Sequence, residues 1–199
     1  MSKKRIGIAV MALGMFLWAA AAYASPEAPR LLPPPMALPV PSGFLKVLLL
    51  LTFFVHLVLV NVLLGSVILS VIDRRASASD RKGGVAFMPK VLALAVNFGV
   101  APFLFLQVLY GHFLYPSIVL MAVWWMFVAL FAMLAYYGLY VSDGAVRPAR
   151  RTPILFLSAL LLLMTAFLLS NASTLMLRPD FWFRWFSEPH GHLLNTSDP

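Results

Sequence analysis

Four long apolar stretches, separated by short polar connections, limit this chain of 199 residues to a membrane fold. They cover about residues 44–72, 89–111, 117–141 and 153–177. Each has at least the roughly 20 residues that a helix needs to cross a bilayer core, where the backbone must satisfy its own hydrogen bonds. The composition agrees, because only 11% of the residues are charged, whereas about 25% are charged in soluble domains. We therefore predict an all-α integral membrane protein with a bundle of four transmembrane helices over residues 43–178.

The N-terminal part of the chain contains two further segments. Residues 1–24 join a basic head that begins at Lys3 to an apolar stretch and a small-residue site that ends at Ala24, which predicts a cleavable signal peptide. The alternative is an uncleaved anchor that forms a fifth spanning helix. Residues 25–42 are rich in proline, which fixes φ and lacks a backbone donor, so we predict an extended periplasmic arm there.

Basic residues cluster in two of the three connections between the apolar stretches, and such connections stay in the cytoplasm. They are Arg74, Arg75, Arg81, Lys82 and Lys90 in the first connection and Arg147, Arg150 and Arg151 in the third. The second connection, expected over 111–116, contains no basic residue. This pattern predicts a protein of a bacterial inner membrane with both mature termini in the periplasm (N-out and C-out). The formal charge of +8 therefore reflects topology and does not indicate a nucleic-acid-binding surface.

The C-terminal tail, residues 179–199, contains Trp182, Trp185 and three phenylalanines close to arginine. Such a composition predicts an aromatic anchor in the outer headgroup region, with a docking surface for a partner subunit as the alternative. His190 and His192 form a weak metal-binding pattern, because two histidines leave most of a coordination sphere empty. The chain has no cysteine, which excludes disulfides, iron–sulfur clusters and covalently attached haem c.

Function has to be sought in the few polar side chains of the apolar stretches. The candidates are His56, Asn61, Asn97, Gln107, His112 and Asn171. No acidic or basic residue lies in the middle of a stretch, which makes a transporter the weakest hypothesis. His56 lies about 20 Å along the first helix, at a depth where an imidazole needs a hydrogen bond or a metal.

Two roles are open for His56. It is either an axial ligand of haem iron or the donor of a hydrogen bond to another helix, for example to Asn97 or Asn171. His112, near the outer end of the second stretch, is either an ordinary interfacial histidine or part of a shallow site such as one for a quinone headgroup.

Motifs on three of the four helices occur in an order that points to a known family. The first helix contains Leu51-Thr-Phe-Phe-Val-His56, the second contains Asn97-Phe-Gly-Val-Ala followed by Gln107, and the fourth contains Ser170-Asn-Ala172. In this order and spacing they resemble the N-terminal four-helix half of subunit I of the cytochrome bd quinol oxidases. The resemblance implies a high-spin haem b with His56 as its axial ligand and quinol as the substrate. It also implies that Asn97, Gln107, His112 and Asn171 lie in the haem or quinol environment.

The chain departs from this family in its acidic residues. A glutamate of the family's second helix corresponds to Gln107, and the paired glutamates of its third helix have no counterpart. A glutamine cannot transfer a proton through its own ionisation, which puts oxygen reduction in question. The resemblance thus implies a haem-b-binding subunit of a bd-like respiratory complex that passes electrons from membrane quinol toward a haem or cytochrome partner. The alternative is a cofactor-free structural or assembly subunit of a membrane respiratory complex.

Partners follow from the small size of this membrane domain. Four helices and one histidine leave a haem partly uncovered, so we expect another membrane subunit or a second copy to complete the site. The bilayer covers the remaining apolar surface. Because both extramembrane arms are expected outside, a periplasmic c-type cytochrome is the expected electron partner.

Overall fold

The computed structural model describes residues 38, 40–72, 78–144, 148–179, 182 and 190–195, without the side chains of 78–86 and 143–149. In this part of the chain the fold is all-helical, and four helices are long and apolar enough to cross a membrane, as the sequence predicts. These helices are α2 (Ser42–Ile72), α3 (Ala78–Leu120), α4 (Ala122–Gly144) and α5 (Pro148–Met176). The predicted signal peptide and nearly all of the predicted arm lie outside the described residues.

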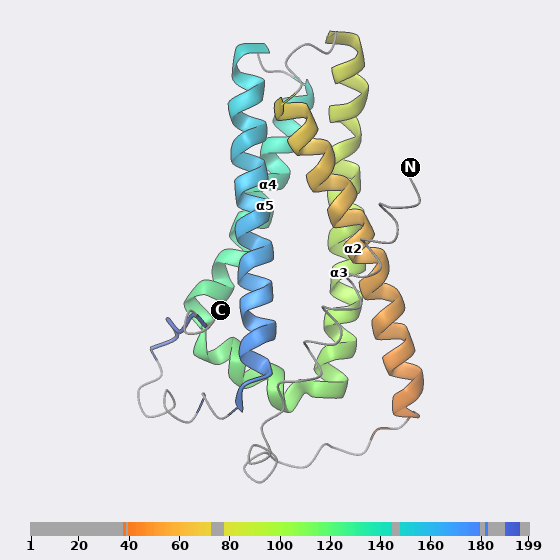
Figure 1. Ribbon diagram of the computed structural model, residues 1–199, viewed down its shortest axis with the longest axis vertical. Coiled ribbons are helices and arrows are strands. Elements are labelled where there is room, and N and C mark those ends of the chain that lie inside the picture. The colour runs from red at the N-terminus through yellow and green to blue at the C-terminus, as the bar shows by residue number, and fades with distance from the viewer. Residues whose placement is uncertain are drawn as a thin grey trace, which may run out of the picture.

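The helices form two antiparallel hairpins, α2 with α3 and α4 with α5 (Figure 1). The end of α2 and the start of α3 lie at the same end of the molecule as the end of α4 and the start of α5, and we call this the hairpin end. The α3–α4 junction and residues 190–195 lie at the opposite end, which we call the tail end. The start of α2 and the end of α5 also lie at the tail end, so the helix ends that flank the basic connections are at one end and both ends of the helical domain are at the other.

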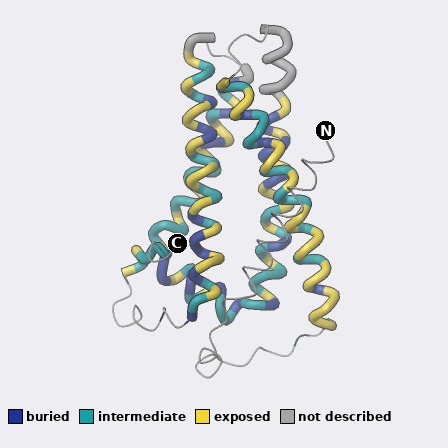
Figure 2. Tube along the Cα trace, in the orientation of Figure 1, coloured by how far each residue is buried: buried dark blue, intermediate teal, exposed yellow. Residues whose placement is uncertain are grey.

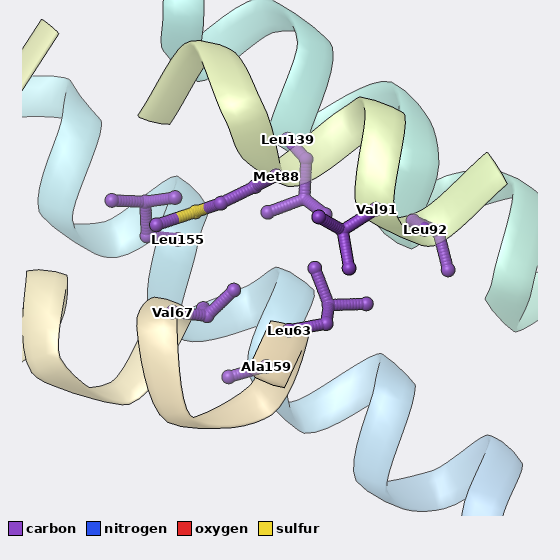
Figure 3. Packing of buried hydrophobic residues seen from close by; sticks show 8 residues of the cluster. All are labelled: Leu63, Val67, Met88, Val91, Leu92, Leu139, Leu155 and Ala159. Carbon is purple, nitrogen blue, oxygen red and sulfur yellow. The ribbon is translucent and has the colours of Figure 1, made fainter. Parts of the chain in front are cut away.

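A core near the hairpin end joins the two hairpins, and all four helices contribute to it (Figure 3). Its members are Leu63, Val67, Met88, Val91, Leu92, Leu139, Leu155 and Ala159. Each of these residues is at most 7% exposed, whereas most of the outward surface of the helices is exposed and apolar (Figure 2). Because lipid is as apolar as leucine, this core holds the hairpins together through close packing.

Within the second hairpin, α4 and α5 are in close contact where two small residues meet. A Cβ atom on Gly138 would collide with the hydroxyl oxygen of Ser158. The Ser158 hydroxyl donates to the carbonyl of Ile154 at 3.0 Å, so this buried polar group is satisfied within its own helix. Small residues at such a contact are typical of helix packing in membranes.

The junction between the hairpins differs from the expected turn over 111–116 and from the expected start of the third helix at 117. Helix α3 continues to Leu120, and its one non-helical residue is Tyr110, with φ of −134° and ψ of 26°. The segment 111–120 crosses the tail end of the molecule from one hairpin to the other (Figure 1). Its buried residues are Gly111, Leu114, Ser117 and Leu120. At about 100° per residue, successive members of this set lie about 60° apart, so together they cover about half of the helix circumference. Packing of this half stabilises a helix where glycine and proline favour a turn.

Candidate functional site

His56 lies on the face of α2 that packs against α3. Its Nδ1 lies 2.8 Å from the carbonyl oxygen of Ala95 on α3, and because a carbonyl can only accept, Nδ1 carries the proton. In the neutral imidazole this leaves a lone pair on Nε2. The ring makes no other hydrogen bond to the described residues, and His56 is half-buried. His56 is therefore held by one nitrogen, and its other nitrogen is available as a ligand atom.

Two neighbours hold the His56 ring in place. A Cβ atom on Gly99 of α3 would lie 2.8 Å from Cε1 and 2.9 Å from Nδ1 of His56, so the ring occupies the space that glycine leaves open. The ring of Phe53 lies nearly parallel to it, with centroids 6.4 Å apart and an interplanar angle of 26°. The backbone of α3 and the preceding turn of α2 together determine the orientation of the imidazole.

The hydrogen bond between helices that the sequence suggests for His56 is present, but its acceptor differs from the suggested side chains. Asn97 bonds to Ala93 of its own helix instead, at 2.9 Å. Asn171 bonds to the tail, as described below. The acceptor for His56 is a main-chain carbonyl, which no pattern of side-chain types could have identified.

The other candidates do not gather around His56. Asn97 is exposed, since it points away from the hairpin. Gln107 is half-buried and makes no hydrogen bond with the described residues, which leaves its amide available. His112 lies beyond the kink of α3, with its ring tilted against Phe113 at a centroid distance of 4.3 Å.

Asn171 fixes the C-terminal tail. Its Nδ2 donates to the Asn195 carbonyl at 3.2 Å, and its Oδ1 accepts from the Asn195 backbone nitrogen at 3.0 Å. Asn171 is buried, and these two bonds engage both ends of its amide. In this structure the amide therefore serves the tail, and a contact with haem or quinol stays a prediction for this residue.

The tail residues 190–195, which we call the docked tail, cover the junction between α3 and α4. The backbone nitrogen of Val123 donates to the Gly191 carbonyl at 3.0 Å, and Leu193 donates to the Leu120 carbonyl at 3.1 Å. The indole of Trp124 donates to the His192 carbonyl at 2.9 Å. The first of these bonds satisfies an amide at the start of α4 that has no partner within its own helix.

The composition of the tail does not predict this docking, and Gly191 is the one residue in the sequence that is consistent with a sharp bend there. Gly191 has φ of 69°, a left-handed conformation that favours glycine. His190 and His192 are exposed on either side of it. No group of three or more metal-ligating side chains is found among the described residues.

At Trp182 the structure differs from the expectation that the aromatic residues of the tail form an anchor in the headgroup region. This side chain is 1% exposed and packs inside the protein, so it does not anchor the tail in headgroups. Its indole nitrogen donates to the Leu175 carbonyl at 2.7 Å, and its ring meets Phe113 edge-on with centroids 6.2 Å apart. The segment 183–189, with Trp185, lies outside the described residues.

The fold and this site define a helical protein of the membrane type with a histidine fixed between two helices. Comparisons of the chain with protein-family models, with curated proteins and with solved structures gave no match. The resemblance to cytochrome bd subunit I therefore rests on the motifs around His56, Asn97 and Asn171.

Proposed function

We propose that this protein is a haem-b-binding membrane subunit of a cytochrome bd-like respiratory electron-transfer complex. It passes electrons from membrane quinol toward a haem or cytochrome partner, and it is not catalytic alone. His56 is the axial ligand of the haem iron. The positive-inside rule supports an orientation with the hairpin end in the cytoplasm and the tail end in the periplasm of a bacterial inner membrane.

The hydrogen bond between the His56 ring and the Ala95 carbonyl is the observation that supports this proposal best. Histidines that ligate a metal through one nitrogen usually donate the other N–H to a carbonyl or a carboxylate, which fixes the tautomer and the ring plane. The bond from Nδ1 to the Ala95 carbonyl has this form and leaves Nε2 as the ligand atom. At this depth in an apolar span, an Nε2 without a partner is costly unless it binds something.

Two apolar neighbours of His56 support this proposal. When bound there, haem b supplies reversible one-electron transfer. His56 holds the iron, and the Ala95 carbonyl orients the imidazole. Gly99 leaves room for the ring, and Phe53 adds apolar surface beside it, which keeps water away.

Partners complete this proposal. His56 is only half-buried, so another membrane subunit or a second copy covers the rest of the haem. Gln107, whose amide makes no hydrogen bond with the described residues, is our candidate contact for the quinol headgroup. A periplasmic c-type cytochrome accepts the electrons at the tail end. A purified complex that reduces no added cytochrome c and contains no c-type haem would exclude this acceptor.

The ligand role of His56 is tested by spectroscopy on the protein purified from its native membranes with its bound subunits. We expect a b-type α-band in the reduced-minus-oxidised spectrum of the wild type and its loss in His56→Ala. His192→Ala is the matched control, because this exposed histidine contributes only its main-chain carbonyl to the fold. A band that survives in His56→Ala, or a wild-type complex without haem b assigned to this chain, would overturn the proposal.

The alternative function also has a specific observation in its favour. The bond from His56 to the Ala95 carbonyl joins α2 to α3, and this gives the histidine a structural role without any cofactor. If the protein is a structural or assembly subunit, the variant His56→Gln can still donate to the Ala95 carbonyl. We then expect it to form a complete complex with unchanged activity. The haem proposal predicts that the same variant assembles but loses electron transfer.

A further inference from the structure

The outward face of α2 carries a regular line of exposed residues. Only Leu45, Leu63 and Val67 of this helix are buried, and they face the rest of the bundle. On the other side, residues that alternate in spacing by three and four form what we call the outer seam. Its members are Phe44, Val47, Leu51, Phe54, Val58, Asn61, Gly65, Ile68 and Ile72. All are exposed except Gly65, which is half-buried, and this 3–4 spacing is the pattern of a helix that packs along another helix.

A polar side chain such as Asn61 is unfavourable on a surface that only lipid covers. It lies about 28 Å along α2 at about 1.5 Å per residue, well inside the apolar span. Its Nδ2 donates to the Leu57 carbonyl of its own helix at 2.8 Å, and its side-chain oxygen has no partner among the described residues. An amide oxygen without a donor costs free energy in hydrocarbon, so this position favours a protein neighbour.

Gly65, one turn after Asn61, opens the same face. No atom lies within 4 Å of a Cβ atom built on Gly65, so nothing in the single chain requires a glycine there. Gly99 and Gly138 differ, since a Cβ atom on either would meet a neighbouring helix. A small residue beside a polar one on a spanning helix is typical of an interface where two backbones approach closely.

We infer that the outer seam of α2 is the interface of a homodimer in the membrane, in which the two Asn61 side chains bond to each other. Both copies insert in the same direction, so a two-fold axis along the membrane normal places each seam residue opposite its own counterpart at the same depth. An amide both donates and accepts, which makes two asparagines complementary to each other. A single asparagine in such a seam fixes the register of the two helices.

The depth of the polar groups favours a second copy. His56 contacts both Ala95 and Gly99, so Asn97, the other exposed asparagine of this hairpin, lies level with His56. Asn61 is five residues farther along α2, or about 7 Å deeper toward the hairpin end. Asn61 therefore finds a partner at its own depth in another Asn61 and not in Asn97.

This interface is independent of the proposed function. Asn61 follows His56 by five residues, which places it about 140° around the helix at about 100° per residue. The dimer therefore leaves the side of α2 that bears His56 as it is.

Cysteine cross-linking tests the interface, because the wild-type chain has no cysteine. We would oxidise membranes that contain the full chain with Ile68→Cys and expect a disulfide-linked dimer. Two matched variants should stay monomeric. One is Ser66→Cys, two residues away on α2 but about 110° outside the seam, and the other is Met133→Cys, which is 70% exposed on α4.

A second measurement uses energy transfer between labelled copies in lipid vesicles. We expect Asn61→Leu to lower the association constant roughly three- to thirty-fold, the range that one hydrogen bond between membrane helices spans. Gly65→Ile should abolish association while the single chain keeps its fold, because a Cβ atom at this position has no neighbour within 4 Å. Equal cross-linking of all three cysteine variants, cross-linking of Ile68→Cys to a different protein, or unchanged association in Gly65→Ile would each overturn the inference.

Discussion

At two glycines of this protein, a side chain of a neighbouring helix lies against the helix backbone. Gly99 leaves space for the His56 ring, and Gly138 leaves space for the Ser158 hydroxyl. In both pairs a polar side chain of one helix lies against the backbone of the next helix. Membrane helices gain little from burying apolar surface against each other, so the fit at such contacts contributes directly to stability.

Gly99→Ala should therefore destabilise the protein. The new methyl group would lie 2.8 Å from Cε1 of His56, which forces the ring away and weakens its bond to Ala95. We expect a loss of about 1–3 kcal/mol, the usual cost of overpacking, as measured by denaturant titration in detergent. Gly43→Ala is the matched control, because nothing lies within 4 Å of its Cβ position. Equal stability of the two variants would show that His56 is not held by Gly99.

At the scale of elements, the tail end is built from pieces far apart in the chain. The segment 111–120 crosses that end, Trp182 fills the space beside Phe113, and the docked tail covers the start of α4. The two hydrogen bonds between Asn171 and Asn195, which we call the latch, attach the docked tail to α5.

Asn171→Leu should release the docked tail. The substitution removes two hydrogen bonds and leaves the Asn195 backbone groups without partners, which costs about 1–3 kcal/mol. We expect faster cleavage within residues 190–195 by a protease added at the tail end, with the four spans intact. Asn97→Leu is the matched control. The side-chain amide that it removes forms a hydrogen bond only within its own helix, so cleavage should stay at the wild-type rate. Similar protection in both variants would contradict the latch.

The described part of the molecule consists of two hairpins joined near the hairpin end, and the orientation that we propose for it rests on charge alone. The helix ends that flank the basic connections lie at the hairpin end, and the start of α2 and the end of α5 lie at the tail end. In a cysteine-free chain, single cysteines report their side without background. We expect an impermeant thiol reagent to label Val40→Cys in intact spheroplasts and to label Ala76→Cys only after lysis. The reverse pattern would invert the proposed topology.

The parts of this fold that the sequence predicts are those that depend on composition along one segment. The four spans follow from hydropathy, because a helix in lipid must satisfy its own backbone. The helix over 111–120 was missed because its stability comes from a buried face that exists only when α5 and the tail are in place. His56 was identified from its cost in an apolar span, but its acceptor, the Ala95 carbonyl, depends on how α2 and α3 align.

The docked tail also sets the order in which this protein can be completed during synthesis. It is bonded to the start of α4 by residues that leave the ribosome much later, with 68 positions between Trp124 and His192. At about 5–20 residues per second this is a delay of roughly 3 to 14 seconds, during which the first turn of α4 lacks its final partners. A nascent chain that stops before residue 190 can have all four spans inserted and still lack a closed tail end.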